Sequence, residues 1–354
     1  MVTSKKIAAI DMFCGAGGLT HGLKLSGINV IAGFDIDATC KYAYEENNQA
    51  KFVSKDIRQI SAKEILDFFP ENSEKIMVGC APCQTFSMHT HKVSDKENDQ
   101  KWGLIAEYLK KIIEVKPSIV SMENVPGITK YPIFESFVSS LEKEGYLVSY
   151  QIVYCPDYGI SQSRRRLVLL ASKYGPISLI KPTRTKDNYL KVKDIIGNLP
   201  AIKAGETDKN DSLHFAASLS QLNKQRMRLS KPGGSWMDWP MSLRAECHKK
   251  ASGSTYKSVY ARMAWDAIAP TITTQFYNFG TGRFGHPSQD RALSVREGAL
   301  IQTFPLTYKF VPKGEVIKKS TVCRMIGNAV PVRLGQIIGE SIMQHLSANQ
   351  RLGN

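Results

Sequence analysis

The stretch KIAAIDMFCGAGGLTHGLKLSG, residues 6–27, decides the fold of this chain. It opens with a short apolar run that predicts a β-strand, and residues 17–27 predict a helix that ends at a glycine. Gly15, Gly17 and Gly18 stand where the strand gives way to the helix. Glycine at such a turn lets the backbone pass close to a ligand, so the stretch predicts the first strand-helix unit of a ligand-binding sheet.

The alternation of strand and helix continues along the chain. Apolar runs predict further strands at 28–37, 75–82, 118–125, 147–154 and 165–172. Helices are expected at 38–48, 104–115 and 133–145. This alternation favours an α/β fold with a doubly wound, mostly parallel sheet and helices on both of its faces.

The pattern changes in the second half of the chain. Residues 173–290 carry turn-forming pairs, several aromatic residues and an excess of positive charge. Between Lys173 and Arg262 there are 17 basic and 7 acidic residues, which predicts a smaller, loop-rich second domain. The chain ends in an amphipathic helix whose apolar face needs a sheet to cover. We therefore expect one domain over 1–178 plus 318–354 and a second over 179–317.

The composition of the 354 residues narrows the function classes. A hydrophobic fraction of 42% suffices for two cores, and no apolar run is long enough to span a membrane. The seven cysteines lack the spacing of a disulfide framework and the N-terminus lacks a secretory signal, so we expect a cytoplasmic location. The formal net charge of +15 suits a polyanionic partner, although a solvated lysine-rich surface is an alternative interpretation.

The glycine loop and a downstream aspartate indicate the kind of ligand. The spacing of Gly15, Gly17 and Gly18 differs from the G-x-G-x-x-G that seats a pyrophosphate. Asp35 ends the second apolar run, where a carboxylate can accept hydrogen bonds from ribose hydroxyls. Phe13 at this turn could stack on adenine, and a phenylalanine packed in the core is the alternative interpretation. These features predict a nucleoside ligand without a pyrophosphate, such as S-adenosylmethionine, whereas the plainer alternative is a tight turn beside a surface aspartate.

The motif GCAPCQTFS at residues 79–87 raises a question of cysteine chemistry. Zinc coordination by Cys80 and Cys83 would need a second pair of ligands, and the sequence has none at suitable spacing. A redox pair would need a helix directly after the motif, where the sequence is long and polar. Two interpretations stay open: a pair of buried thiols, or a single nucleophile at the end of a strand.

Three charged residues favour the nucleophile. Glu123 follows an apolar run in SMENVPG, an unusual place for a carboxylate unless it is paired or works in a site. Arg164 and Arg166 alternate near the start of the last predicted strand, which would place them on one face of it. Because strands of a doubly wound sheet end at the ligand crevice, we expect Cys83 to lie there with these three residues.

The ordered motifs of this chain resemble those of the DNA cytosine-5 methyltransferases, in particular the bacterial modification enzymes. They are DMFCGAGG, GCAPCQTFS, MENVPG, QSRRRLVLL, RALSVREGALIQTFP and GNAVP, and they extend from about residue 7 to the C-terminal helix. The resemblance implies a Rossmann-like, S-adenosylmethionine-dependent methyltransferase fold with a smaller target-recognition domain. Leu300 departs from the family pattern, which usually has arginine there, so the packing of the second domain is expected to differ.

The resemblance also implies a reaction. The thiolate of Cys83 would add to C6 of a cytosine flipped out of duplex DNA, with a positive charge from Arg164 or Arg166 favouring the thiolate. Glu123 would bind N3 and the exocyclic amine, while Arg166 would hold O2. The methyl group would pass from S-adenosylmethionine to C5 and leave S-adenosylhomocysteine, and loss of the C5 proton would then release Cys83.

By motif position, the resemblance assigns binding roles to residues far apart in the sequence. Asp35 would bind the ribose, Ile36 would flank the adenine, and Asp56 would accept a hydrogen bond from the adenine amino group. Gln84 and Ser87 would contact the DNA near the flipped base. No metal ligand is expected, and the expected cofactor residues are Phe13, Gly15, Gly17, Gly18, Leu19, Asp35, Ile36, Asp56, Ile57, Pro82, Asn328 and Val330.

The same resemblance implies the partners. We expect a specific double-stranded DNA sequence as substrate, a monomeric enzyme, and a restriction endonuclease that acts on the same site without a stable complex. A tRNA cytosine-5 methyltransferase of the same fold is the nearest alternative, because it shares the chemistry. A catalytically silent DNA-binding protein is a further alternative, and the presence of Cys83, Glu123 and Arg166 argues against it.

Overall fold

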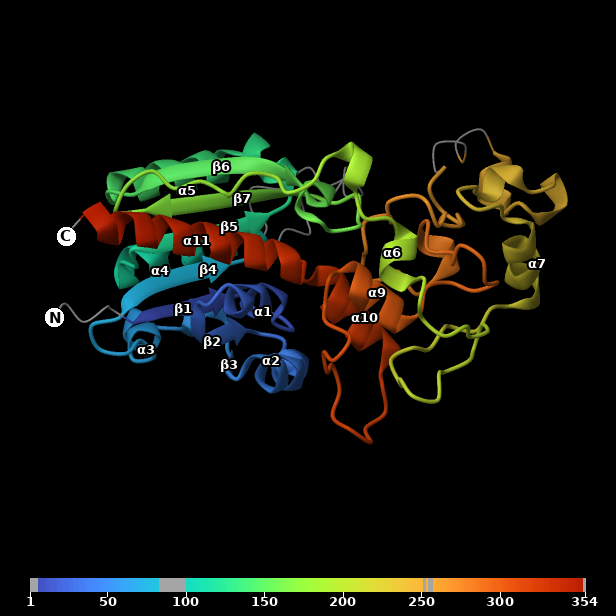
Figure 1. Ribbon diagram of the computed structural model, residues 1–354, viewed down its shortest axis with the longest axis horizontal. Coiled ribbons are helices and arrows are strands. Elements are labelled where there is room, and N and C mark those ends of the chain that lie inside the picture. The colour runs from blue at the N-terminus through green and yellow to red at the C-terminus, as the bar shows by residue number, and fades with distance from the viewer. Residues whose placement is uncertain (1–5, 83–99, 251–252, 254–256, 353–354) are drawn as a thin grey trace. The chain divides into compact units, whose positions relative to one another are not determined.

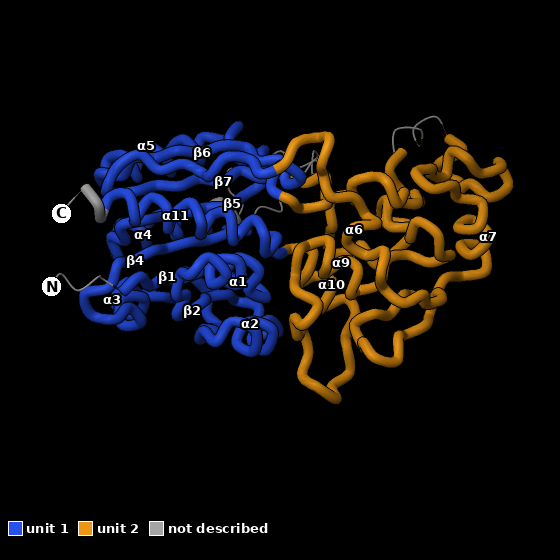
Figure 2. The backbone as a smooth tube through the Cα atoms, viewed as in Figure 1, with its two compact units in different colours: residues 1–158, 165–183, 329–354 blue, residues 159–164, 184–328 orange. Residues whose placement is uncertain are grey.

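The computed structural model describes residues 6–82, 100–250, 253 and 257–352. The chain divides into two compact units, shown in different colours in Figure 2. The C-terminal segment belongs to the N-terminal unit, so the chain passes from unit 1 to unit 2 and back again. The main boundaries fall at 183/184 and 328/329, where the sequence predicts 178/179 and 317/318. Unit 1 comprises residues 1–158, 165–183 and 329–354, and unit 2 comprises residues 159–164 and 184–328.

Unit 1 is built on a seven-stranded sheet with the strand order β3-β2-β1-β4-β5-β7-β6 (Figure 1). Neighbouring strands from β3 to β5 are parallel, whereas β7 runs antiparallel to both β5 and β6. The predicted α/β fold with a mostly parallel, doubly wound sheet is therefore confirmed. The strands are β1 (Ile7–Met12), β2 (Asn29–Asp35), β3 (Lys51–Ser54), β4 (Glu74–Gly79), β5 (Ile119–Asn124), β6 (Leu147–Tyr154) and β7 (Arg165–Ser172).

β1 lies inside the sheet with β2 on one side and β4 on the other, and its residues from Ala8 to Met12 are buried. The order of strands along the sheet reverses at this point. Such a topological switch leaves a crevice beyond the carboxyl ends of the two diverging strands. The amide of Cys80, just after β4, donates a 3.2 Å hydrogen bond to Met12 O, so the segments that leave β1 and β4 start side by side.

The sequence pattern does not predict β3, which has four residues and lies at the edge of the sheet. An edge strand of this length carries too short an apolar run to stand out. Its pairing with β2 places Ser54 opposite Asp35, and the amide of Lys55 donates a 3.0 Å hydrogen bond to Asp35 O. β3 thereby brings the following residues, including Asp56, to the end of β2.

Helices cover both faces of the sheet (Figure 1). α1 packs against α11 on one face, and α4 packs against α5 on the other. The short α3, which the sequence pattern does not predict, packs against α4. The helices of unit 1 are α1 (Gly18–Leu25), α2 (Lys41–Asn48), α3 (Ala62–Leu66), α4 (Gln100–Val115), α5 (Pro132–Lys143) and α11 (Val332–Leu352).

Glycines allow α1 and α11 to approach each other closely. A Cβ atom on Gly22 would collide with the backbone of Val332 and Gln336. A Cβ atom on Gly335 would lie 2.8 Å from Leu19 O, a separation that requires the backbones to move apart. Since the two helices come from opposite ends of the chain, this contact explains why the C-terminal segment folds into unit 1.

Unit 2 consists mainly of loops and short helices, as its composition predicts. Its described residues form isolated β-bridges rather than strands. A buried ion pair orders it: Arg291 Nη1 and Nη2 each donate a 2.7 Å hydrogen bond to Glu297, and both side chains are almost fully buried. The helices of unit 2 are α6 (Val192–Ile196), α7 (Gln221–Leu229), α8 (Glu246–Lys249), α9 (Val295–Ile301) and α10 (Lys319–Asn328).

Within the described ranges of both units, no helix has the length and apolar character needed to cross a membrane.

Candidate active site

The loop after β1 places three residues in the left-handed backbone region. Gly15 has φ 50° and Gly17 has φ 87°, conformations that glycine adopts without steric cost. Phe13 has φ 62°, which costs a non-glycine residue roughly 1 kcal/mol. Its ring packs edge-on against Tyr108 with 6.2 Å between centroids, a contact that offsets this strain. The amide of Gly17 donates a 2.9 Å hydrogen bond to Cys14 O and closes the turn.

Asp35, at the end of β2, is bound to this loop. The amide of Gly15 donates a 2.8 Å hydrogen bond to Asp35 Oδ2, and the amide of Asp37 donates one of 2.8 Å to Oδ1. Burial raises the pKa of the Asp35 carboxyl, while these two amides oppose the rise. Each oxygen keeps a lone pair beyond its backbone hydrogen bond, so the carboxylate can accept further donors such as ribose hydroxyls.

Asp11, in β1, is a second buried carboxyl next to the loop. Its Oδ2 accepts a 2.6 Å hydrogen bond from Thr20 Oγ1 of α1, and its Oδ1 has no hydrogen-bond partner among the described residues. Burial raises the pKa of Asp11 to about 7; the Thr20 hydrogen bond opposes the rise and the charge of Asp35 adds to it. Sequence reasoning did not single out this residue, because an aspartate inside a predicted strand gives no sign of its burial.

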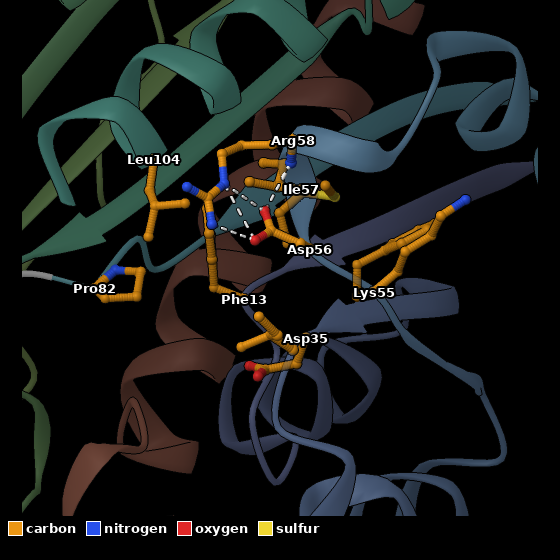
Figure 3. Close-up of a pocket in the computed structure, with 11 residues that line it drawn as sticks. Phe13, Asp35, Lys55, Asp56, Ile57, Arg58, Pro82 and Leu104 are labelled. Atoms are coloured by element: carbon orange, nitrogen blue, oxygen red, sulfur yellow. Dashed lines mark hydrogen bonds and ion pairs between the residues drawn. The ribbon is translucent and has the colours of Figure 1, made fainter. Parts of the chain in front are cut away.

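A pocket opens at this edge of unit 1 (Figure 3). It encloses about 520 Å³ including the space at its mouth. Ile36 has 68% of its surface exposed, so it presents apolar area that a flat ring can cover. The pocket is lined by Met12, Phe13, Phe34, Asp35, Ile36, Lys55, Asp56, Ile57, Arg58, Pro82 and Leu104.

Asp56 precedes a short 3-10 helix, Ile57–Gln59, and pairs with Arg58 (Figure 3). The carboxylate accepts hydrogen bonds from the backbone amide of Arg58 at 2.9 Å and from its Nε and Nη2 at 3.0 and 2.5 Å. The side-chain hydrogen bonds of Arg58 lower the pKa of Asp56. The pair thus keeps an ionised hydrogen-bond acceptor in the lining of the pocket.

A second group of side chains lies at the ends of β4 and β5. Glu123 in β5 is 2% exposed. Its Oε1 lies 3.0 Å from Arg166 Nε, an ion-pair contact outside hydrogen-bond geometry, and its Oε2 accepts a 2.8 Å hydrogen bond from the thiol of Cys80. Antiparallel pairing of β5 with β7 brings Arg166 to Glu123. A buried carboxyl held from two sides is an arrangement suited to binding a polar substrate in a defined orientation.

Arg164 and Arg166 have different surroundings. β7 begins at Arg165, so Arg164 lies before the strand, and the expectation of a shared strand face is not met. Arg164 belongs to unit 2, where it is buried and its Nη1 donates a 3.2 Å hydrogen bond to Ile272 O. Arg166 belongs to unit 1 and contacts Glu123. Alternation places two side chains on one face only where both residues lie in the strand, and Arg164 precedes its first residue.

The remaining residues that the sequence predicts in the site are distributed over both units and the undescribed part of the chain. Gly18 and Leu19 form the buried start of α1, and Val330 is buried in unit 1. Asn328 is the exposed last residue of α10 in unit 2. The roles of all expected site residues stay predictions, and three of these residues lie outside the described ranges: Cys83, Gln84 and Ser87.

Sequence reasoning missed several residues of these two sites. Lys55, Arg58 and Leu104 line the pocket, and Cys80 contacts Glu123. Arg58 did carry a signal, because an arginine two positions after an aspartate at a helix start can reach back to the carboxylate. No signal in the sequence indicated that Cys80 contacts Glu123, since only the order of the strands brings the two residues together. Among the described residues, no group of three or more metal-ligating side chains forms a metal site.

Comparison with known proteins gives the sites their family. A family model described as C-5 cytosine-specific DNA methylase matches residues 7–344. The chain belongs to this family. It is a DNA cytosine-5 methyltransferase, as the ordered motifs predict, and DNA is its substrate. The match to this methyltransferase family spans the pocket, the group around Glu123 and all of unit 2.

Two relatives and two solved structures illustrate the likeness of this methyltransferase to others. It is 52% identical over 342 residues to Type II methylase M.HgiDII of Herpetosiphon aurantiacus, with 96% of each chain covered. It is 30% identical over 355 residues to Type II methyltransferase M.Sau96I of Staphylococcus aureus, covering 97% of this chain and 77% of that one.

The solved structures share its fold. A candidate DNA modification methyltransferase from an Escherichia coli prophage superposes with a TM-score of 0.74 at 20% identity, covering 96% of this chain and 99% of that one. Methyltransferase EhMeth of Entamoeba histolytica superposes with a TM-score of 0.71 at 17% identity, covering 97% and 99%. At these identities the likeness concerns the Rossmann-like fold alone.

Proposed function

We propose that this methyltransferase transfers a methyl group from S-adenosylmethionine to C5 of a flipped-out cytosine in one specific duplex sequence, through a covalent bond between Cys83 and C6. The observation that carries the proposal is the pair of sites in unit 1, the pocket that contains Asp35 and the group around Glu123. In the sequence, Cys83 directly follows Pro82, a residue of the pocket lining.

The pocket residues fit S-adenosylmethionine. Asp35 has free lone pairs for the ribose hydroxyls, and the exposed apolar surface of Ile36 suits one face of the adenine. The ionised Asp56 suits the adenine amino group, which is a donor. Gly15 and Gly17 leave the loop without side chains where the ligand passes. When bound, the cofactor supplies the methyl group and leaves as S-adenosylhomocysteine.

The chain's own residues activate the base in this proposal. The Cys83 thiolate forms a bond to C6, which pushes electron density toward C5. Glu123 gives a proton to N3 and accepts a hydrogen bond from the exocyclic amine, using the oxygen atoms that Cys80 and Arg166 contact, so the negative charge that develops in the ring is neutralised as the bond forms. Arg166 also binds O2 of the cytosine. Loss of the C5 proton to solvent then breaks the bond to Cys83 and restores the thiolate, and N3 returns its proton to Glu123.

The other expected residues keep supporting roles in the proposal. Arg164 orders the loop before β7 through its hydrogen bond to Ile272 O. Val330 completes the cofactor pocket, with Phe13, Gly18, Leu19, Ile57 and Pro82. Gln84 and Ser87 contact the DNA beside the flipped base, which must leave the stack before Cys83 reaches C6.

We assign recognition of the DNA sequence to unit 2. The basic segment from Lys173 to Arg262, which belongs to unit 2 from Arg184 onward, suits contacts to phosphates, which position a protein on the duplex. By analogy with the relatives named Type II methyltransferases, the enzyme protects a site from a restriction endonuclease that acts without forming a stable complex. It acts as a monomer in the cytoplasm, where the cell's DNA lies.

The test is transfer of labelled methyl groups from S-adenosylmethionine to duplex DNA and, separately, to total tRNA, followed by bisulfite sequencing. The proposal expects label on duplex DNA at cytosines within one short sequence. Label confined to tRNA would reassign the substrate while keeping the mechanism. Label on neither would favour a silent DNA-binding protein.

A second measurement isolates the nucleophile. Cys83→Ser should abolish methyl transfer and leave the dissociation constant for S-adenosylhomocysteine nearly unchanged, because the substitution removes the thiolate and not the pocket. Methyl transfer at the normal rate by this variant would rule out the covalent mechanism.

A further inference from the structure

Cys80 holds a defined position between two strands. It directly follows β4, and its backbone amide donates a 3.2 Å hydrogen bond to Met12 O at the end of β1. Its side chain is half-buried. The thiol donates a 2.8 Å hydrogen bond to Glu123 Oε2, across 43 residues of sequence. Cys80 directly follows β4 and Glu123 lies in β5, and these two strands are adjacent and parallel. Their pairing therefore holds the thiol within hydrogen-bond distance of the carboxyl.

The opposite oxygen of the same carboxyl is constrained from another strand. Glu123 Oε1 lies 3.0 Å from Arg166 Nε, and the guanidinium itself is anchored because its Nη1 donates a 2.7 Å hydrogen bond to Arg165 O. Among the described residues, the two oxygens of Glu123 therefore have different neighbours, a cation at Oε1 and a neutral donor at Oε2. A carboxyl with two different neighbours has one preferred rotation, whereas a carboxyl held only by the cation could turn.

We propose that Cys80 is a positioning residue for the methyl transfer reaction, and that it acts by fixing the rotation of the Glu123 carboxyl. This inference rests on the proposed role of Glu123 in binding N3 and the exocyclic amine of cytosine. The thiol neither touches the reacting atoms nor changes its bonding during the reaction. It keeps Oε1 and Oε2 in the orientation that meets the edge of the base, and it satisfies an acceptor that is 2% exposed.

The chemistry of the thiol sets the expected size of the effect. A thiol is a weak hydrogen-bond donor, so the loss of this contact should slow the reaction moderately rather than abolish it. Its removal leaves Oε2 without this partner and frees one torsion of Glu123. A small error in the orientation of a catalytic group lowers the rate of the chemical step and leaves the affinity for the substrate nearly unchanged. We therefore expect Cys80→Ala to slow methyl transfer about tenfold.

The experiment compares Cys80→Ala, Cys80→Ser and Cys323→Ala under single-turnover conditions. Serine keeps a donor at position 80 and should retain the rate within about twofold. Cys323 is a buried thiol of α10, so its substitution controls for the loss of a cysteine side chain and should leave the rate unchanged. The dissociation constants for DNA and S-adenosylhomocysteine, and the midpoint of thermal unfolding, are measured for each variant.

A Glu123→Gln background provides the decisive comparison, because a merely structural role of Cys80 would not depend on it. If the thiol acts through the carboxylate, Cys80→Ala slows the wild-type enzyme about tenfold and slows Glu123→Gln little further. Equal slowing in both backgrounds, or no slowing by Cys80→Ala, would overturn the positioning role while leaving the function of Glu123 intact. A normal rate for Glu123→Gln alone would refute the role of Glu123, and with it this inference.

Discussion

The guanidinium of Arg58 lies against the carboxylate of Asp56 in the wall of the pocket, with Nε 3.0 Å from Oδ1 and Nη2 2.5 Å from Oδ2. The two residues are separated by one position, and the backbone amide of Arg58 donates to the same carboxylate. The result is a carboxylate that is ionised and fixed in orientation before any ligand arrives. A preorganised acceptor of this kind reduces the entropy lost when a donor binds.

Removal of the arginine should therefore weaken cofactor binding. We expect Arg58→Ala to raise the dissociation constant for S-adenosylhomocysteine about three- to tenfold in calorimetric titration, with no change in the midpoint of thermal unfolding. Lys63→Ala removes an exposed ion pair with Asp67, away from the pocket lining, and serves as the control with unchanged affinity. Equal affinities for Arg58→Ala and wild type would show that the ion pair does not preorganise Asp56 for the cofactor.

The amide of glutamine cannot replace the carboxyl of Glu123. Glu123→Gln should lower the single-turnover rate about a hundredfold, because an acid-base partner in the reaction typically contributes a factor of that order. Binding of S-adenosylhomocysteine should stay within about twofold, since Glu123 is absent from the pocket lining. Rapid quenching of labelled methyl transfer measures the rate, and an unchanged rate would remove Glu123 from the chemical step.

The buried Asp11 predicts a pH dependence of stability. Its pKa is about 7 in the folded protein and near its ordinary value of 3.8 when unfolded. Between these values the folded state binds a proton that the unfolded state has lost, so the contribution of Asp11 is most favourable below pH 4 and is lost as the pH rises through 7. Relative to Asp11→Asn, the wild type should lose free energy of unfolding over that interval in urea titrations. Parallel curves for the two proteins would contradict the raised pKa.

The close approach of α1 and α11 predicts that alanine substitutions at two glycines have different effects on the free energy of unfolding. Gly335→Ala should lower the free energy of unfolding by about 1–3 kcal/mol, because its methyl group would press on Leu19 O. Gly103→Ala, in the open on α4, should leave stability unchanged or raise it by up to about 1 kcal/mol, since alanine favours a helix. Urea denaturation measures both. A loss of similar size at both positions, or no loss at Gly335, would contradict the role of the close contact.

The basic segment of unit 2 predicts salt-sensitive DNA binding. Affinity for duplex DNA should fall roughly a hundredfold or more between 50 and 200 mM salt, because each neutralised phosphate releases counterions. The double substitution of the exposed Lys231 and Lys250 by glutamine should reduce the salt slope by about 1 to 2, whereas the same change at Lys41 and Lys63 of unit 1 should not. Fluorescence anisotropy gives the slopes. A flat dependence would exclude the segment as the binding surface.

The sequence by itself determined the order of strands and helices and the residues at the strand ends. Apolar periodicity and glycine position are local properties, so the strand at 165–172 and the turn after residue 13 follow from neighbours in the chain. Parallel strands also end at one edge, which is why Asp35 and Glu123 could be assigned to the functional edge of the sheet. The family followed from the same short motifs.

Only the tertiary structure decided which side chains meet. The short edge strand β3 carries Asp56 to the end of β2, and the adjacency of β4 and β5 brings Cys80 to Glu123. Arg164 and Arg166, although separated by one residue, fall into different units. Such contacts depend on strand order and register, which arise from the packing of the whole chain, and no local pattern in the sequence encodes them.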